Sequence, residues 1–412
     1  MSLTSVNSYS TNIVVTQMKR VLVILLVFHF IFTLITKAQL VSGPFEYNTS
    51  IISESAINFS GGLKRGYTFY GLEQGSLTFN TDTAKFWKGG CFFVHVLNIH
   101  GLGPTQKFVG DLMYLSNIEA GDYLGLYEYW FSQEIGKLKL LFGQHDMNTE
   151  FAGTKYGENF INSSYGVVSN LLLNLHVSIY PVAAPCILAK YSFSNNLLLR
   201  VASYDGEPGN METNKFNVHW HINSREGLMN LAEVQYSAIK YNQNGITTSR
   251  GIQMGTYKLG LFYHTAKFTS YQDTTKKVSG NYGMYFIADR MIVPKPSNPY
   301  EGLAAIFEIG VSSPKYNMID YSIEGGIRYY GILPYRTKDF IGLAFTYAHL
   351  SSYFIKMYPN RASSECSIEF SYKFEFGKHY TIQPDFQYII DPGAIKSVPY
   401  AFVGLIRIQL TL

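Results

Sequence analysis

The feature that most constrains the fold of this chain is a strict alternation of side-chain character near its C-terminal end. Charged or small residues alternate with apolar ones: Glu365, Ser367, Glu369, Ser371, Lys373 and Glu375 against Cys366, Ile368, Phe370, Tyr372, Phe374 and Phe376. The segment 401–412 repeats the pattern, with Arg407 and Gln409 opposite Ile406 and Ile408. A period of two is the signature of a β-strand with one polar and one apolar face. Such strands occur in soluble sandwiches and in membrane barrels, so other features must separate the two.

An apolar run near the N-terminus indicates export. The run Val21 to Ile35 follows the basic pair Lys19-Arg20 and precedes small residues up to Ala38, which is the arrangement of a secretory signal peptide. We expect residues 1–38 to be this signal peptide, with translation starting at Met18. Residues 39–62 are polar and without pattern, so we expect a short N-terminal segment there and a single domain over 63–412.

Composition favours a membrane barrel. No apolar run after the signal reaches the length of about 18 residues that a spanning helix needs. Aromatic residues make up 16% of the chain, with 33 Tyr, and charged residues only 15%. Outer-membrane barrels combine few charges with aromatic girdles at both membrane interfaces. About fourteen to sixteen alternating runs are separated by turn residues, so we predict an all-β fold, a transmembrane antiparallel β-barrel of about sixteen strands.

The charges support this assignment because they keep to the polar face of each run. A charge at the middle of the bilayer costs about 2 to 4 kcal/mol, so the apolar faces suit lipid and the polar faces suit a wet lumen. In the run 123–132, alternation places Tyr123, Tyr127 and Phe131 on the lipid face and Glu128 and Trp130 in the lumen. Without the signal peptide, basic and acidic residues nearly balance, which gives no case for binding nucleic acid.

Several segments resemble the OprB-type carbohydrate-selective porins. The segment Ile382 to Gly393 (IQPDFQYIIDPG) is similar to the QPDxQYxxxPGG segment of that family. Weaker similarities lie at Glu365 to Lys373, Gly331 to Gly342, and Tyr127 to Gln133 with Gly143 and Phe151. The resemblance implies a sixteen-stranded barrel in outer-membrane lipid of a bacterial cell, passing small sugars by passive diffusion as a monomer or a trimer. It also implies that the barrel-assembly machinery recognises the C-terminal strand.

Strand parity assigns a set of side chains to the lumen, and these are the candidates for the substrate path: Glu128, Trp130, Glu308, Glu324, Arg328, Glu369, Lys373, Asp385, Gln387 and Arg407. Mixed signs with an acidic surplus suit neutral sugars, whose hydroxyls need donors and acceptors together. Trp130 could offer an apolar platform to a sugar ring, or it could pack against an inward-folded loop. For the charged residues the alternative is a set of structural ion pairs between neighbouring strands.

No catalytic, cofactor or metal site is predicted. His219 and His221 are expected to share one face of a strand, two residues apart, but no third metal ligand lies near them in the sequence. The nucleophile motif G-x-S-x-G is absent from the sequence. We therefore expect a channel and not an enzyme. The alternatives are a general or ion-selective porin, or a barrel with an adhesive or structural role.

Overall fold

A computed structural model describes residues 43–209, 211, 214–220, 222–240, 252–295, 298, 301–333 and 335–412. The chain divides into two compact units, Met1–Pro44 and Phe45–Leu412, and the second unit contains every strand and helix described below. The expected signal peptide, residues 1–38, and His221 lie outside the described residues.

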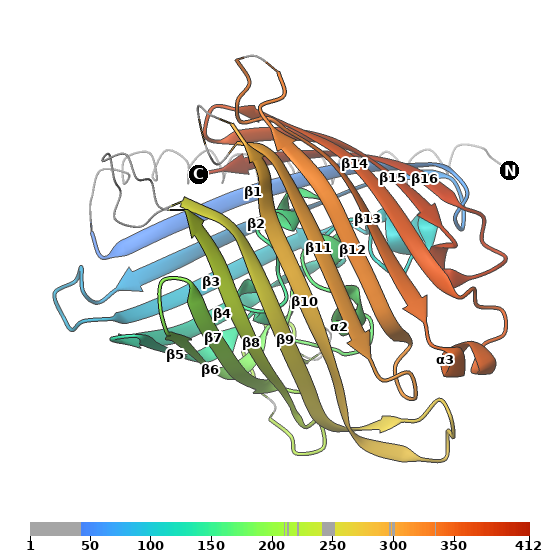
Figure 1. The fold of residues 1–412 in the computed structure, drawn as a ribbon, viewed down its shortest axis with the longest axis horizontal. Coiled ribbons are helices and arrows are strands. Elements are labelled where there is room, and N and C mark those ends of the chain that lie inside the picture. The colour runs from blue at the N-terminus through green and yellow to red at the C-terminus, as the bar shows by residue number, and fades with distance from the viewer. Residues whose placement is uncertain are drawn as a thin grey trace, which may run out of the picture. The chain divides into compact units, whose positions relative to one another are not determined.

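The second unit is a closed barrel of antiparallel strands (Figure 1). Its strands are β1 (Phe45–Ser60), β2 (Gly66–Asn80), β3 (Gly90–His100), β4 (Tyr123–Ile135), β5 (Leu138–His145), β6 (Ala184–Ser192), β7 (Leu197–Asp205), β8 (Leu228–Lys240), β9 (Ile252–Thr269), β10 (Lys277–Pro294), β11 (Gly302–Ser312), β12 (Ile319–Tyr330), β13 (Phe340–Leu350), β14 (Ser364–Phe376), β15 (Tyr380–Ile390) and β16 (Ala401–Thr411). Each strand pairs with its neighbours in sequence, and β1 pairs with β16 to close the sheet. Closure leaves no strand edge unpaired, as a membrane-spanning sheet requires. The predicted all-β barrel of about sixteen strands is confirmed.

The helices are short and lie in the connections between strands. They are α2 (Ser169–Leu172), α3 (Ser352–Met357), a π-helical turn (Thr105–Val109) and single 3₁₀ turns at Met147–Thr149, Gly157–Asn159, Ser163–Tyr165 and Pro392–Ala394. Within the described part of the chain, no helix has the length and apolar character needed to cross a membrane.

The alternation that predicted β14 is present in the barrel wall. Glu369 is fully buried on the inner side, whereas Phe370 is 44% exposed on the outer side. The register with β15 pairs Glu369 with Gln387 and Phe370 with Phe386, so polar residues face polar ones across the strands. The polar face therefore points into the barrel and the apolar face points out.

The barrel begins earlier in the chain than expected. Strand β1 spans Phe45–Ser60, within the segment 39–62 that was expected to precede the barrel. Its inner face carries Ile52 and Ala56, and its outer face carries Ser53 and Ser55. The inner face also carries Glu54 and Asn58, and the outer face also carries Ile51 and Ile57. Because both faces mix polar and apolar residues, the alternation is blurred and sequence reasoning missed the strand.

A β-bulge in β4 overturns part of the predicted face assignment. The register with β3 pairs His95 with Glu128 and then Val96 with Leu126, which leaves Tyr127 as an extra residue. A bulge shifts the alternation by one residue. Tyr127 and Tyr123 are therefore buried with the inward residues, and the assignment of Tyr123 and Tyr127 to the lipid face is wrong.

Long and short connections segregate to opposite ends of the barrel. The connections β3–β4, β5–β6 and β7–β8 share one end and span 101–122, 146–183 and 206–227. The connections β4–β5 and β14–β15 are tight turns at the other end. Outer-membrane barrels have short periplasmic turns and longer extracellular loops, so the long connections mark the extracellular end.

Candidate functional site

Two of the long connections fold into the barrel. Segment 101–122 joins β3 to β4, and segment 146–183 joins β5 to β6 and contains α2. Val109, Leu115, Phe151 and Leu171 within them are completely buried. In Figure 1, α2 lies behind β11 and β12, the two strands that it contacts. The interior of the barrel is therefore largely occupied by these two segments.

Segment 101–122 is tied to the wall by residues of β14, β15 and β16. Glu365 accepts hydrogen bonds from the backbone N–H groups of Leu112 at 2.8 Å and Met113 at 3.0 Å. Gln387 donates to the carbonyl oxygen of Leu115 at 2.8 Å. Arg407, which is also paired with Glu54, donates to the side chains of Ser116 and Asn117. Three adjacent strands thus fix the position of this segment.

Segment 146–183 is held mainly by wall carboxylates that accept backbone N–H groups. The bonds are Asp146 to Glu128 at 3.0 Å, Ala152 to Glu233 at 3.0 Å, Lys155 to Asp289 at 3.0 Å, Ile161 and Asn162 to Glu369 at 2.7 and 3.0 Å, and Ser169 to Glu324 at 3.0 Å. These bonds satisfy amides that would otherwise be buried without a partner. The acidic surplus on the inner wall therefore has a structural use.

Glycines in the wall let this segment approach closely. A Cβ atom at Gly310 of β11 would lie 1.8 Å from the Oδ1 atom of Asn170 in α2. A Cβ atom at Gly342 of β13 would lie 2.7 Å from the ring of Phe160. Any larger residue at these positions would push segment 146–183 away from the wall.

The two inward segments also bind each other. The backbone N–H of Asn117 donates to the carbonyl oxygen of Ile161 at 2.9 Å, and that of Ser163 donates to Tyr114 at 3.1 Å. The hydroxyl of Ser163 donates to the carbonyl oxygen of Met113 at 3.1 Å. The two segments therefore form one joined constriction.

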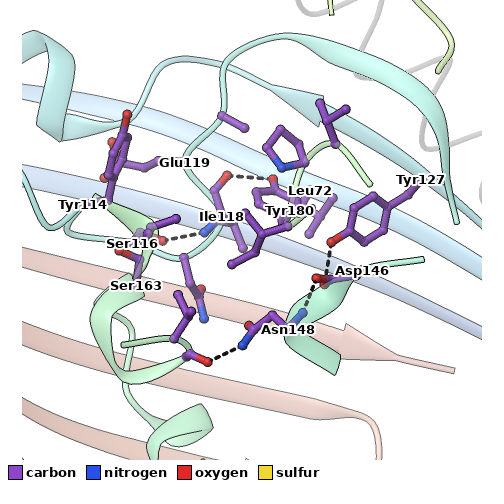
Figure 2. A pocket seen from close by; sticks show the side chains of 18 of the residues that line it. Leu72, Tyr114, Ser116, Ile118, Glu119, Tyr127, Asp146, Asn148, Ser163 and Tyr180 are labelled. Atoms are coloured by element: carbon purple, nitrogen blue, oxygen red, sulfur yellow. Dashed lines mark hydrogen bonds between the residues drawn. The ribbon is translucent and has the colours of Figure 1, made fainter. Parts of the chain in front are cut away.

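A cavity of about 970 Å³ remains beside the joined segments (Figure 2). Its apolar lining includes Ile52, Leu72, Ile118, Tyr127, Tyr180 and Val182. Its polar lining includes Gln74, Asn117, Glu119, Glu128, Asp146, Asn148, Ser163 and Arg407. Apolar surface with a few fixed polar groups is typical of sites for small molecules.

Two tyrosines and an acid organise one side of this cavity. The hydroxyl of Tyr127 donates to Asp146 at 2.6 Å, and the hydroxyl of Tyr180 donates to the carbonyl oxygen of Ile118 at 2.9 Å, as Figure 2 shows. The Tyr127 and Tyr180 rings are 6.3 Å apart and nearly perpendicular, at 78°. With both hydroxyls engaged, the orientation of these rings is fixed.

Three acids of the inward segments have a raised pKa. Burial, reinforced by the neighbouring Glu128 carboxylate, raises the pKa of Asp146 to about 7. Burial also raises the pKa of Asp111 to about 7, and burial together with Asp111 raises the pKa of Glu119 well above its ordinary value. Part of the acidic surplus is therefore neutralised by protons near neutral pH.

The residues predicted from strand parity lie at the wall, and most of them lie beneath the inward segments. Glu128 and Arg407 line the cavity. Glu324, Glu369 and Gln387 are completely buried and hold the two segments through the bonds given above. The substrate-path role of these residues stays a prediction.

The remaining predicted residues are also largely covered. Asp385 is buried beside Gln387, which donates to it at 3.0 Å, and Lys373 lies 3.7 Å from Glu375. The Arg328 guanidinium is sandwiched between the rings of Tyr156 and Tyr330, 4.0 and 4.3 Å from their centroids. Glu308 is completely buried opposite Glu324, and within the described residues its carboxylate has no hydrogen-bond partner.

Trp130 points inward, as predicted, but it does not line the cavity. Its ring stacks on Phe93 with centroids 4.8 Å apart and meets His145 edge-on at 6.1 Å. The sugar contact predicted for Trp130 stays a prediction.

Sequence reasoning missed the cavity residues Glu119, Asp146, Asn148, Ser163 and Tyr180, all of which lie on the inward segments. The length of the connections between strands could have pointed to these residues. Loops longer than about 12–15 residues without their own structure are uncommon and usually functional. His219 was assigned to a strand, but it lies in the connection between β7 and β8. Among the residues that the structure describes, no group of three or more His, Cys, Asp or Glu is placed to hold a metal ion.

Comparison with known proteins places the chain in a family. Residues 68–412 match the model of the family described as carbohydrate-selective porin, OprB family. Porin B of Pseudomonas aeruginosa is 22% identical over 414 residues, which cover 90% of this chain and 88% of that protein. The fold is similar to that of Pseudomonas putida OprB in its high-pH structure, with a TM-score of 0.80, 19% identity and coverage of 92% and 96%. The outer-membrane channel DcaP of Acinetobacter baumannii gives a TM-score of 0.56 at 8% identity, with 89% and 97% covered. The chain therefore belongs to the OprB family of carbohydrate-selective porins and is a sugar porin of the bacterial outer membrane.

Proposed function

We propose that small sugars diffuse passively through the cavity beside the joined segments 101–122 and 146–183. The observation that carries this proposal is the mixed lining of the cavity, in which Ile52, Leu72 and two tyrosine rings lie beside carboxyl, amide and guanidinium groups. A sugar has apolar C–H faces and a rim of hydroxyls, so it needs both kinds of surface together.

In this proposal, Tyr127 and Tyr180 form the apolar platform. An aromatic ring can stack on the C–H face of a sugar while its hydroxyl keeps a polar partner. Asp146 and Asn148, which also line the cavity, then exchange hydrogen bonds with the sugar hydroxyls. The groups are neutral or of mixed sign, which supports passage of uncharged sugars over selective passage of ions.

The buried wall carboxylates have an indirect part in this proposal. Glu324 and Glu369 hold segment 146–183 in place and so keep the passage narrow. Glu128 and Arg407 have a direct and an indirect part, because they line the cavity and also bind the inward segments.

Single-channel recording in planar bilayers with added neutral sugar tests the proposal. We expect the wild-type current to be partly blocked by sugar and Tyr180→Ala to weaken the block while the ionic current stays equal or rises. Tyr236→Ala is the matched control, because Tyr236 is on the outer face and 51% exposed. Equal block in both variants would remove Tyr180 from the path. Strong ion selectivity without any sugar block would favour an ion-selective porin.

We also propose how the chain reaches the membrane. Residues 1–38 act as the cleaved signal peptide, and β16 is the strand recognised by the barrel-assembly machinery, which is supported by its position between β1 and β15 at the closure. Mass spectrometry of protein from isolated outer membranes should give a mature N-terminus near Gln39. A product retaining Val21 to Ile35 would contradict the signal-peptide proposal.

A further inference from the structure

The charged groups that line the cavity are mostly acids. Among the described residues, the acids of the lining are Glu119, Glu128, Asp146, Glu158 and Glu207. In the same part of the chain, Arg407 is the only Lys or Arg that lines the cavity. Arg407 is paired with Glu54, a completely buried acid of β1. Its positive charge is therefore balanced within the barrel wall.

Three of the five acids have no cationic partner. Glu128 lies 3.4 Å from Nδ1 of His95, and Glu207 is paired with His176. Within the described ranges, the other three form no ion pair with Lys, Arg or His. We call these residues the three unpaired acids: Glu119, Asp146 and Glu158. The cavity therefore has negative groups that the protein itself does not balance with a positive charge.

Two of the unpaired acids are fixed in place by hydrogen bonds. Glu119 accepts from the backbone N–H and from the hydroxyl of Thr105, each at 3.2 Å. Asp146 accepts from the hydroxyl of Tyr127 at 2.6 Å and from the backbone N–H of Asn148 at 2.8 Å. Figure 2 shows Glu119 and Asp146 on opposite sides of the part of the cavity that it draws. A molecule in the cavity therefore has an acid on either side.

Glu158, the third unpaired acid, is exposed within the barrel. It lies in the 3₁₀ turn Gly157–Asn159 of segment 146–183. Burial and the charge of Asp289 raise the pKa of Glu158, although Lys258 and Lys155 act in the opposite direction. The two lysines therefore do not compensate the negative surroundings of this carboxylate.

A positive charge in the cavity would relieve these surroundings. Burial raises the pKa of Glu119 and of Asp146 as well as that of Glu158. A cation close to a carboxylate favours its ionised form and so opposes such a rise, whereas an anion adds to it. An ammonium group also brings three hydrogen-bond donors and no acceptor, which suits carboxylate oxygens. A carboxylate has no donor to offer and would meet like charges.

We propose that the cavity discriminates between charged sugars by sign: it admits amino sugars, which carry an ammonium group, and disfavours sugar acids, which carry a carboxylate. This inference rests on the proposed function, because it concerns the same passage. Neutral sugars remain substrates, and the ammonium group adds an interaction with the three unpaired acids that a hydroxyl group makes less strongly.

The test is single-channel recording of the full mature porin with three sugars of one ring skeleton. Glucose, glucosamine and glucuronate are added at matched ionic strength and at about pH 7, where most of an amine of this kind is protonated. Block is measured at both signs of the voltage, so that the applied field does not decide the order. We expect glucosamine to block at a concentration about two to five times lower than glucose, the range for an accessible charge pair. Glucuronate should require the highest concentration.

The results separate this inference from the proposed function. Block by all three sugars at equal concentration, or tightest block by glucuronate, would overturn the sign discrimination and leave the sugar passage standing. Absence of block by every sugar would contradict the passage itself and the inference with it.

Charge reversal at Glu158 is the matching variant, because this carboxylate is exposed and none of the causes of its pKa shift is a hydrogen bond. Glu158→Lys should bring the half-blocking concentrations of glucosamine and glucuronate together or reverse their order, and Glu158→Gln should lie between it and wild type. Asp273→Lys is the control, since Asp273 lies in the connection between β9 and β10 and does not line the cavity. The control should keep the order of wild type. An unchanged order in folded Glu158→Lys and Glu158→Gln would overturn the proposal.

Discussion

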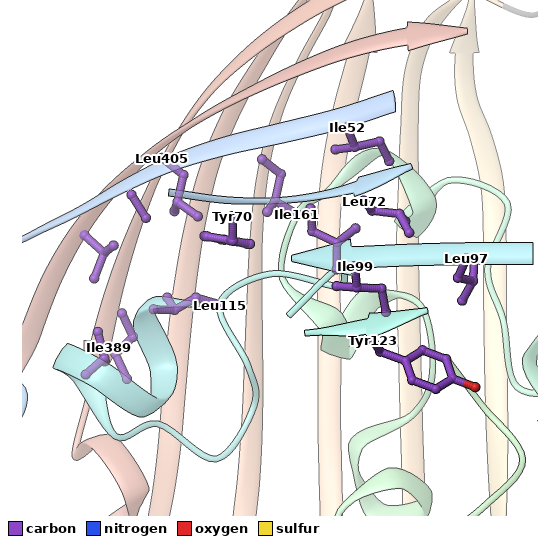
Figure 3. Close-up of a cluster of buried hydrophobic side chains, with 14 of the residues drawn as sticks. Ile52, Tyr70, Leu72, Leu97, Ile99, Leu115, Tyr123, Ile161, Ile389 and Leu405 are labelled. Atoms are coloured by element: carbon purple, nitrogen blue, oxygen red, sulfur yellow. The ribbon is translucent and has the colours of Figure 1, made fainter. Parts of the chain in front are cut away.

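Two parts of the barrel wall differ in the side chains that their inner and outer faces carry. From β8 to β16 the inner face carries buried acids and amides such as Glu324, Glu369 and Gln387, and the outer face is apolar. In β1 to β3 the inner face carries Ile52, Tyr70, Leu72, Leu97 and Ile99, packed around Leu115 and Ile161 of the inward segments (Figure 3). The outer face there mixes Ser53, Glu73 and Asn98 with exposed apolar residues such as Ile57, Phe69 and Val96.

The difference follows from what each wall touches. The β8–β16 wall meets lipid outside and accepts backbone N–H groups inside, so it needs apolar residues outside and carboxylates inside. The inner side of β1–β3 instead packs against apolar side chains of segments 101–122 and 146–183, like the core of a soluble protein. The polarity of the side chains on each face therefore depends on what that face contacts, which can be a packed protein segment as well as lumen or lipid.

The largest difference between the two regions is expected in the free energy of unfolding when a leucine is replaced by alanine in each. Leu97 is completely buried inside β3, whereas Leu343 is 49% exposed outside β13. Leu97→Ala should lower the free energy of unfolding by about 2–5 kcal/mol, because it leaves a cavity in a packed core. Leu343→Ala should cost less, since acyl chains fill the space. Urea unfolding in liposomes measures both, and equal losses would show that the β1–β3 wall has no core of the soluble type.

A slightly smaller contrast is expected for outward arginines. Phe370→Arg places a charge on the apolar side of β14 and should cost about 2–4 kcal/mol near the middle of the membrane. Glu73→Arg replaces one charge by another beside the polar side chains of Asn98 and His100, so its folded yield should stay close to that of wild type. The folded fraction on unboiled gels compares them. A Glu73→Arg variant that folds as poorly as Phe370→Arg would mean that lipid covers both surfaces alike.

The smallest effect concerns pH and the inward segments. Burial and Glu128 raise the pKa of Asp146 from 3.8 to about 7. Because folding favours the protonated carboxyl, its stabilising contribution is complete below about pH 4 and is lost as the pH rises through about 7. Stability measured between pH 4 and 8 should fall less steeply for Asp146→Asn than for wild type. Parallel curves would contradict the assignment. The Asp146 carboxyl accepts hydrogen bonds from the Tyr127 hydroxyl and the Asn148 N–H, and the charge of Glu128 acts on it.

The barrel could be predicted from the sequence because polar and apolar side chains alternate along the strands of the β8–β16 wall. Glu369 and Phe370 lie on the predicted faces since lipid and lumen impose opposite demands on neighbouring residues. Strand β1 was missed because each of its faces mixes polar and apolar residues, such as Ile52 and Glu54 inside and Ser53 and Ile57 outside. Tyr127 was misassigned because a bulge leaves no mark in an alternating pattern.

The cavity could not be predicted in the same way. Tyr180 and Asn148 reach it through the path of segment 146–183, and this path is fixed by contacts with distant residues such as Glu324 and Glu369. Strand parity identified these carboxylates as inward, but it contains no information about which loop amides they accept. Strand parity therefore identified the inward-facing residues as a set, but it did not identify the loop segments that cover them.

The most direct test of the account is the conductance of the double variant Glu365→Gln with Glu369→Gln in planar bilayers. These carboxylates hold both inward segments, through Leu112 and Met113 and through Ile161 and Asn162. An amide replaces one acceptor oxygen with an NH₂ group that cannot accept, so both segments should loosen. We predict a higher ionic current and a weaker sugar block in a barrel that remains folded, while the control Glu375→Gln behaves like wild type. Unchanged current and unchanged sugar block in the folded double variant would contradict the claim that the anchored segments form the sugar passage.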